Sequence, residues 1–365
     1  MNLEARLSEL VSFDTQNPHG DERPLARYLA TELSRVGGAS VDVVEIGAHA
    51  SVFARFGPAP ARLLLNAHID TVPANSGYTA PPHRLDSRDG RLYGLGAADT
   101  KGAIAAILDA LAATNVAQLG RGVAVLFSGD EECGGICMRQ FLADSPHARA
   151  VTHAVVCEPT SCQIGWRHRG IVAIEVRATS EGGHSSRADV LPGPIAILAR
   201  AAVALDELGR RHRDTGPPGF EGLCLNVAAI HGGLAFNVIP TEAKLVVSMR
   251  PAPGADVEAL LAEAERAARV AALPALIEWA VVLANPPFQT ADLSAFAPLL
   301  GQGAMAPVDL AFWTEAALLA ASGIDAVVFG PGNIEQAHAA DEYVSRSDLE
   351  LASDVFRRML ATDGR

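Results

Sequence analysis

The sequence predicts an α/β protein in which a sheet domain built from two chain segments carries an inserted ferredoxin-like domain. Three observations lead to this prediction. Apolar runs of strand length alternate with helical patterns up to about residue 167; half-buried strands and two helices then follow in the order βαββαβ; and the strand-and-helix pattern resumes afterwards. We therefore place the sheet domain at residues 1–167 and 283–365 and the insertion at 168–282. A chain of 365 residues is long enough for two hydrophobic cores.

The first segment begins with two amphipathic helices, because leucines recur at helical spacing in residues 3–11 and 25–36. Strands are expected at 51–56 and 61–67, and the second is apolar on both faces, as in a buried central strand. A helix should follow the glycine-rich stretch 94–102. Further buried strands are predicted at 123–127 and 154–157, with a helix near residues 138–142 between them.

The insertion should begin with a half-buried strand, in which Val172, Ile174 and Val176 alternate with charged residues. A helix at 195–205, strands at 225–230 and 243–249, a helix at 257–264 and a strand at 276–282 complete the βαββαβ order. After it we expect a helix at 313–321 and a strand at 326–329. Ser347 and Glu350 predict a capping box for a last helix.

The composition excludes several classes of protein. The net charge of −13 and the absence of a clustered Lys/Arg run argue against nucleic-acid binding. The sequence contains no uncharged run of 18 apolar residues, so no membrane span is predicted. Five cysteines without a CxxC pair do not indicate structural zinc and fit reduced thiols, and the first residues lack the apolar region of a signal peptide. We expect a cytoplasmic protein.

Polar side chains follow several of the predicted strands. In open α/β sheets, ligands bind beyond the carboxyl ends of the strands. Each of these residues alone has a simple structural explanation, such as a solvated turn, a helix-terminal acid or a surface histidine. Their coincidence at one sheet edge favours a functional site made of His68 and Asp70, Asp99, Glu131 and Glu132, Glu158, and His338.

This set of side chains points to a metal centre. Imidazole and carboxylate ligands without thiolate are typical of catalytic Zn²⁺, Co²⁺ or Mn²⁺. Two histidines and three carboxylates suit two metals that share one carboxylate, and Glu131 would remain as a base for amide hydrolysis. Asp70, two residues after His68, could orient that imidazole. A nucleotide site at Gly94–Gly96 is disfavoured because the third glycine of the motif is replaced by a carboxylate.

The motifs resemble the M20 family of metallopeptidases and deacylases. They are HIDTVP at 68–73, GLGAADTKG at 94–102, DEE at 130–132, EPT at 158–160, GGHSS at 182–186, NVIP at 237–240 and QAH at 336–338. Within the family, the segments 11–18, 312–316 and 329–332 most resemble the acetylornithine and acetylcitrulline deacetylases of arginine synthesis. The resemblance implies a mixed-sheet, di-metal aminopeptidase-like catalytic domain with an inserted dimerisation domain.

The resemblance also implies roles for individual residues. It places His68, Asp99 and Glu158 on one divalent metal and Asp99, Glu132 and His338 on the other, with zinc first and cobalt second as the metal. It makes Glu131 the general base and Asp70 the partner of His68. In the inserted domain, His184 would reach the partner's active site in a homodimer and help to hold the oxyanion. Asn237 and Arg250 would lie near the substrate carboxylate, and Glu315 either contacts the substrate or caps a helix.

The expected activity is removal of the acetyl group from N-acetylornithine or N-acetylcitrulline, by attack of a water that Glu131 and the metals activate. Two alternatives share the metal site: a succinyl-diaminopimelate desuccinylase and an M20 dipeptidase or carboxypeptidase. A third is a catalytically silent member that binds a ligand. Loss of a metal-ligand residue or of Glu131 would favour the catalytically silent member, but the sequence contains all of these residues.

Overall fold

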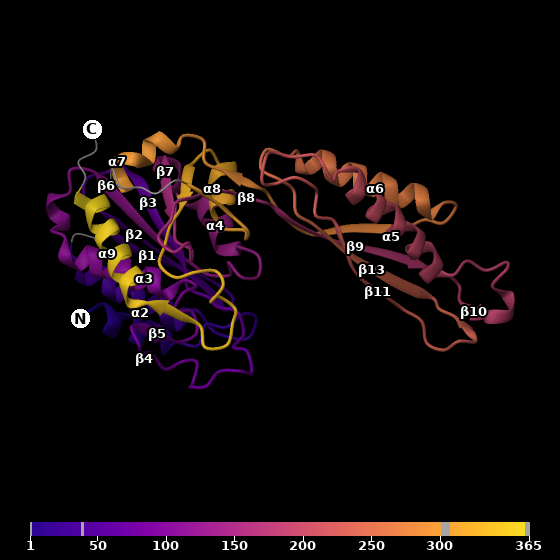
Figure 1. Ribbon diagram of the computed structural model, residues 1–365, viewed down its shortest axis with the longest axis horizontal. Coiled ribbons are helices and arrows are strands. Elements are labelled where there is room, and N and C mark those ends of the chain that lie inside the picture. Colours follow the sequence, from indigo (N-terminus) through magenta and orange to yellow (C-terminus); the bar gives the residue numbers. More distant parts are fainter. Residues whose placement is uncertain (1, 38–39, 301–306, 362–365) are drawn as a thin grey trace. The chain divides into compact units, whose positions relative to one another are not determined.

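The computed structural model describes residues 2–37, 40–300 and 307–361, and Figure 1 shows their course. The chain divides into two compact units. Unit 1 comprises Met1–Trp166, Thr290–Leu310 and Thr314–Arg365, and unit 2 comprises Arg167–Gln289 and Ala311–Trp313. The sequence placed the end of the insertion at residue 282, which falls inside the last long strand of unit 2, Glu278–Asn285.

A nine-stranded sheet, most of which belongs to unit 1, has the order β1-β2-β6-β3-β7-β17-β8-β15, with β16 beside β8; β15 and the last two residues of β8 fall in unit 2. The pairs β3–β6, β3–β7 and β7–β17 are parallel, whereas β1–β2, β2–β6 and β8–β15 are antiparallel. The sheet is therefore mixed, and the predicted α/β class is confirmed. Its strands are β1 Ser40–Ile46, β2 His49–Phe56, β3 Ala61–His68, β6 Gly122–Ser128, β7 His153–Val156, β8 Gly165–His168, β15 Phe288–Gln289, β16 Val308–Leu310 and β17 Asp325–Val328.

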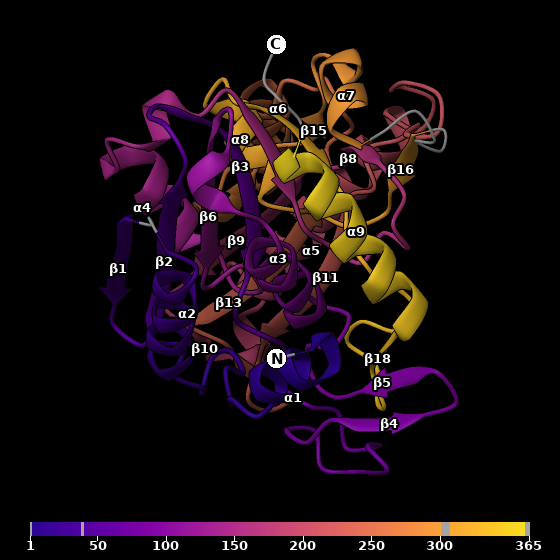
Figure 2. The same cartoon turned by 90° about the vertical axis from the view of Figure 1, so that its left-hand side faces the viewer.

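Helices pack against this sheet, and α3, which lies between α1 and α9, can be followed in Figure 2. A separate three-stranded sheet joins β18, β5 and β4. The bounds of these elements are α1 Leu3–Val11, α2 Arg23–Arg35, α3 Lys101–Ala113, α4 Ile136–Asp144, α7 Ala297–Leu300, α8 Ala316–Ala321, α9 Arg346–Ala361, β4 Asp86–Arg88, β5 Arg91–Tyr93 and β18 Tyr343–Ser345. Short 3-10 helices are η1 Val116–Gln118, η2 Ala148–Ala150 and η4 Leu293–Phe296.

The alternation of a strand explains why β3 is apolar throughout. Leu63 and Leu65 belong to one buried cluster, which also contains Ile104 of α3 and Phe356 of α9. Leu64 and Asn66 are fully buried as well, and successive side chains of a strand point to opposite faces. Both faces of the strand are therefore covered. The strand ends at His68, so the chain delivers this imidazole at the carboxyl edge of the sheet.

Two predicted helix starts differ from the structure. The helix expected from residue 313 begins at Ala316, three residues later. The last helix is not capped by Ser347, because it already begins at Arg346 and the Ser345 hydroxyl accepts the Asp348 N–H at 3.0 Å. Ser345 thus supplies the cap for an N–H of the first turn, two residues before the predicted N-cap.

Unit 2 is a four-stranded antiparallel sheet in the order β11-β13-β9-β14. If β9, β11, β13 and β14 are numbered 1 to 4 along the chain, the sheet order is 2-3-1-4. This is the order of a ferredoxin-like unit, as the sequence pattern predicts. Helix α5 packs on β9, β11 and β13 and also against α6. The elements are β9 Ile171–Thr179, β10 Gly183–His184, η3 Ser185–Arg187, α5 Pro194–Arg211, β11 Asn226–Gly232, β12 Val238–Ile239, β13 Glu242–Met249, α6 Val257–Ala272 and β14 Glu278–Asn285.

Within the described part of both units, no helix combines the length and the apolar character that crossing a membrane requires.

Candidate metal centre

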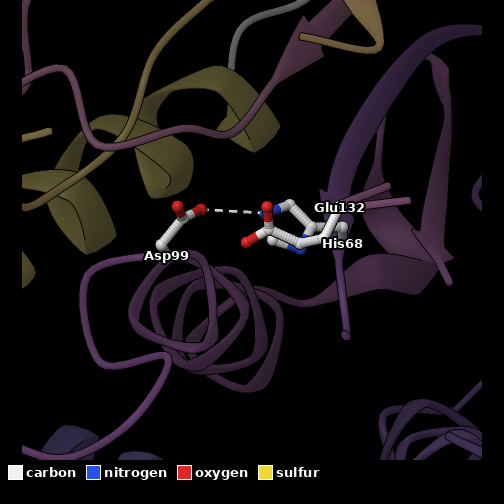
Figure 3. A group of neighbouring side chains, drawn as sticks. All are labelled: His68, Asp99 and Glu132. Atoms are coloured by element: carbon white, nitrogen blue, oxygen red, sulfur yellow. Dashed lines mark hydrogen bonds and ion pairs between the residues drawn. The ribbon is translucent and has the colours of Figure 1, made fainter. Parts of the chain in front are cut away.

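Two elements of unit 1 bring His68 and Asp99 together. His68 is the last residue of β3, and Asp99 lies in the turn that precedes α3. The His68 Nε2 atom is 2.9 Å from Asp99 Oδ1, and both side chains are buried (Figure 3). The Thr100 hydroxyl donates to the His68 main-chain oxygen at 2.8 Å. The first turn of α3 is therefore tied to the end of β3.

His338 contacts the other oxygen of Asp99 and also a carboxylate oxygen of Glu132. The His338 Nε2 atom lies 3.0 Å from Glu132 Oε1 and 3.4 Å from Asp99 Oδ2. Its two carboxylate partners, Asp99 first, raise the pKa of His338 to about 10. Asp99 thus lies between two imidazoles, one on each oxygen, although no pair of these residues is close in sequence.

Glu131 and Glu158 complete the group of acids. Burial, and then the charge of Glu158, raise the pKa of Glu131 well above its usual value. Burial, and then the charge of Asp99, do the same for Glu158. Several carboxylates in one low-dielectric region are unfavourable when all are ionised, unless a cation offsets their charge.

The donor set fits divalent cations. One ligand atom from each of His68, Asp99 and Glu132 lies within 4.8 Å of the others (Figure 3). Burial favours the neutral form of His68, but hydrogen bonds to Asp70 and Asp99 outweigh it and raise the His68 pKa. A divalent ion between nitrogen and oxygen ligands would supply the positive charge that these acids require, with both imidazoles neutral.

Asp70 lies beside His68 but makes other contacts as well. The nearest partner of His68 Nδ1 is the Asp70 main-chain oxygen at 3.0 Å, whereas the carboxylate oxygen is 3.5 Å away. The Asp70 carboxylate accepts the Asn17 amide at 2.6 Å and the main-chain N–H groups of Glu131 and Glu132, both at 3.1 Å. Because β3 ends at His68, the same-face argument from strand geometry does not apply to this pair.

The remaining predicted residues of the insertion lie in unit 2. His184 is exposed in β10, and its Nδ1 atom is 2.9 Å from the Ser186 hydroxyl. Asn237 directly precedes β12, which pairs antiparallel with β10, so His184 and Asn237 are neighbours at this small two-stranded sheet. Arg250 is exposed just beyond the other end of β13, away from that sheet. Its main-chain oxygen accepts a hydrogen bond from Arg169.

Glu315 lies in the interior, directly before α8. It is 1 % exposed, and Ser128 of β6 donates its hydroxyl to Glu315 Oε2 at 2.5 Å. Asn66 of β3 donates to the same Ser128 oxygen at 3.0 Å. The Glu315 side chain makes no cap hydrogen bond to α8, so the capping role considered for it is wrong. The Glu315 carboxyl therefore lies close to the carboxyl ends of β3 and β6, and His68 is the last residue of β3.

The buried Glu315 predicts a measurable pH effect. Burial raises its pKa from 4.5 to about 7. The folded protein then holds more protons than the unfolded chain between these values, so this group lowers stability as pH rises. Glu315→Gln, which stays neutral, should gain up to about 3 kcal/mol over the parent between pH 5 and pH 8. Urea unfolding of both proteins at the two pH values, under identical metal loading, measures this difference.

The exposed Glu350 on α9 offers the matched control. Glu350→Gln should follow the parent at both pH values. If the stability difference between Glu315→Gln and the parent did not change with pH, Glu315 would already be ionised in the folded protein across this range.

Several residues of the centre could not be recognised from sequence. Thr100, Asn17 and the buried Glu342 all contact site residues or their main chain. The only signal in the sequence is their place beside a motif. Thr100 follows Asp99, and Glu342 comes four residues after His338.

Comparison with known proteins identifies the family. The model of peptidase family M20/M25/M40 matches residues 64–362, which include the whole group of acids and histidines described above. The chain belongs to this peptidase family. As an M20 chain it resembles the N-acetyl-L-citrulline deacetylase of Xanthomonas campestris pv. campestris, with 34 % identity over 97 % of this chain and 96 % of that protein. The acetylornithine deacetylase of Myxococcus xanthus is 35 % identical over 98 % and 97 %.

Solved structures agree on the fold of the M20 chain. A metallo-carboxypeptidase of the M20 family from Sulfolobus solfataricus covers 100 % of this chain and 99 % of its own at a TM-score of 0.81, with 19 % identity. A dinuclear metal-binding peptidase of the same family from Bacillus subtilis gives a TM-score of 0.70, with 16 % identity over 98 % of this chain and 97 % of that one. The predicted membership of the M20 family and its fold class are confirmed.

Proposed function

We propose that this M20 chain is a two-metal amidohydrolase that removes the acetyl group from N-acetylornithine or N-acetylcitrulline, releasing acetate and a free α-amine for arginine synthesis. One observation carries the proposal: two imidazoles and two acids from separate parts of the chain lie within contact distance of one another. They are His68, Asp99, Glu132 and His338, and each belongs to one of the family motifs. The full-length similarity to deacetylases named for these substrates supports an acetyl group on ornithine or citrulline.

In this proposal His68, Asp99 and Glu158 hold one divalent ion, and Asp99, Glu132 and His338 hold the other. Asp99 suits the shared position because its two carboxylate oxygens face different histidines. Zinc is the proposed metal, with cobalt as a substitute, because both accept imidazole and carboxylate ligands. Such ions supply Lewis acidity toward the amide carbonyl and lower the pKa of a water. Metal analysis of protein purified from its native cells tests the identity of the metal.

Glu131 is the proposed proton carrier. Its carboxylate accepts a proton from the attacking water and then donates it to the nitrogen of the departing amine. Burial, and then the charge of Glu158, raise the pKa of Glu131, which suits a group that must hold a proton between two steps. Asp70 supports this role, because its carboxylate binds the main-chain N–H of Glu131.

A substrate panel tests the proposed function. The metal-loaded protein is assayed with N-acetylornithine, N-acetylcitrulline, N-acetylmethionine, succinyl-diaminopimelate and an unmodified dipeptide. We expect kcat/KM for one of the first two to exceed all others by at least about 10-fold. A preference for the succinyl compound or the dipeptide would instead assign a desuccinylase or a dipeptidase. Equal low rates would contradict the arginine-pathway assignment, and no turnover would indicate a silent family member.

We also propose a homodimer formed through unit 2, in which His184 acts at the partner's active site. The exposed imidazole of His184 in β10 and the family motif around it support this proposal. His184→Ala should lower kcat by about 10²- to 10³-fold, as loss of an oxyanion donor does, while metal content stays unchanged. Sedimentation should give twice the mass of one chain. A fully active monomer would remove His184 from the mechanism.

A cytoplasmic location is the last part of the proposal. The five cysteines are all free thiols, which fits a reducing compartment. Fractionation of native cells, followed by detection of the chain, tests this location; recovery from an oxidising compartment would contradict it.

A further inference from the structure

Glu342 is a buried acid that no step of the proposed chemistry uses. It is 2 % exposed and lies in the loop between His338 and β18. Its Oε1 atom accepts the main-chain N–H of Ala98 at 2.8 Å and of Asp99 at 3.0 Å. Its Oε2 atom accepts the N–H of Gly96 at 2.8 Å. Both oxygens are therefore engaged with one short segment of main chain.

The segment that Glu342 binds is the one that presents Asp99. The Glu342 main-chain oxygen also accepts the Gly94 N–H at 2.9 Å, so residue 342 holds this segment from Gly94 to Asp99. Gly96 has φ +78° and a Cβ there would come within 2.8 Å of the Thr71 side chain, which leaves the main chain closely packed. Buried main-chain donors require acceptors, and here one carboxylate supplies them.

The surroundings of Glu342 act on its ionisation in both directions. Lys101, at the start of α3, is fully buried, and its ammonium group donates to the Phe13 main-chain oxygen at 2.9 Å. Burial, and then the charge of Asp99, raise the pKa of Glu342 to about 7, whereas the main-chain N–H donors and the charge of Lys101 favour its carboxylate form. The three main-chain hydrogen bonds, rather than charge alone, tie Glu342 to this segment.

We propose that Glu342 is a positioning residue that joins the loop carrying His338 to the segment carrying Asp99, so that both ligands are held ready for metal. The carboxylate binds the main chain of Asp99, while its own chain leads back to His338 within four residues. Each metal of the proposed centre would use Asp99, so displacement of this segment should weaken both sites. The inference rests on the two-metal centre of the proposed function.

Glu342→Gln tests the proposal directly. The glutamine side chain keeps the shape but replaces one acceptor oxygen by an amide NH₂ group, which must face a main-chain N–H. We expect the dissociation constants for Zn²⁺ and Co²⁺ to rise by about 10- to 100-fold, the usual effect of losing a group that orients metal ligands. Metal affinity is measured by competition with a chromogenic chelator. Glu335→Gln, an exposed acid of the same loop, is the matched control and should bind metal like the parent.

A second readout separates positioning from a merely structural role. The visible spectrum of the cobalt-loaded protein reports ligand geometry and should change in Glu342→Gln but not in Glu335→Gln. The rise in Tm upon metal addition should also be smaller in Glu342→Gln. If Glu342 only stabilised the fold, Tm would fall equally with and without metal, and the spectrum would match the parent.

Glu342→Asp keeps the charge but shortens the reach, and serves if the glutamine variant does not fold. It should bind metal with an affinity between those of parent and Glu342→Gln. A folded variant of either kind with parental metal affinity and cobalt spectrum overturns the proposal. These measurements need no substrate, so failure of the deacetylase assignment leaves them interpretable. If the parent itself binds no metal ion, the two-metal centre fails first, and the inference with it.

Discussion

Replacing Glu131 by glutamine is expected to lower kcat for hydrolysis of the N-acetyl amino acid by about 10²- to 10⁴-fold, the usual contribution of a general base. Glutamine cannot accept the proton of the attacking water, but it preserves the size of the side chain and leaves the proposed metal ligands His68, Asp99, Glu132, Glu158 and His338 unchanged. Steady-state assays of acetate release measure the loss, and elemental analysis should find parental metal content.

The control for this variant is Glu350→Gln, which changes an exposed acid on α9 in the same way. It should retain parental kcat and KM. Near-parental kcat in Glu131→Gln would remove the base assignment. Loss of metal from that variant would instead make Glu131 a ligand.

Asp99→Asn should have the largest effect on metal binding. Asp99 contacts His68 with one oxygen and His338 with the other, and hydrogen bonds from these histidines hold its pKa below the usual range in spite of burial. An amide offers only one ligand oxygen, so both metal positions lose affinity. We expect the dissociation constants to rise by more than about 100-fold, beyond the effect of changing a residue that only orients a ligand.

Equilibrium dialysis with Zn²⁺ measures this effect, and Asp109→Asn is its control, because Asp109 lies on α3 and pairs with Arg357 instead. If Asp99→Asn still bound two ions per chain with parental affinity, Asp99 would not bridge the metals.

The strand positions, and the place of His68 at the end of a buried strand, were predictable because both depend on local sequence. An apolar run such as 61–67 has to be covered on both faces, and a polar residue that directly follows it, here His68, emerges at the sheet edge. The ferredoxin-like order was also predictable, because each half-buried strand of the insertion alternates in hydrophobicity and each helix has an apolar stripe.

Contacts between segments distant in sequence were not predictable in this way. Glu342 binds main-chain groups about 245 residues away, and no periodicity marks a buried acid of that kind. The Asp70 carboxylate lies 3.5 Å from the His68 imidazole, as expected, but its hydrogen bonds from the N–H groups after β6 had no signal in the sequence. Glu315 reads as a helix-terminal acid in sequence, whereas tertiary packing buries it beside Ser128. Such contacts depend on tertiary packing and on buried main-chain N–H groups that need acceptors, and local sequence patterns contain no signal for either.

Metal titration tests the central claim most directly. Metal-free protein is prepared with a chelator, and acetate release from N-acetylornithine and N-acetylcitrulline is followed as Zn²⁺ or Co²⁺ is added in known amounts. The two-metal account predicts that metal-free protein is inactive and that activity on one of these substrates rises until about two ions are bound per chain. Undiminished acetate release without metal, or full activity at one ion per chain, would contradict it.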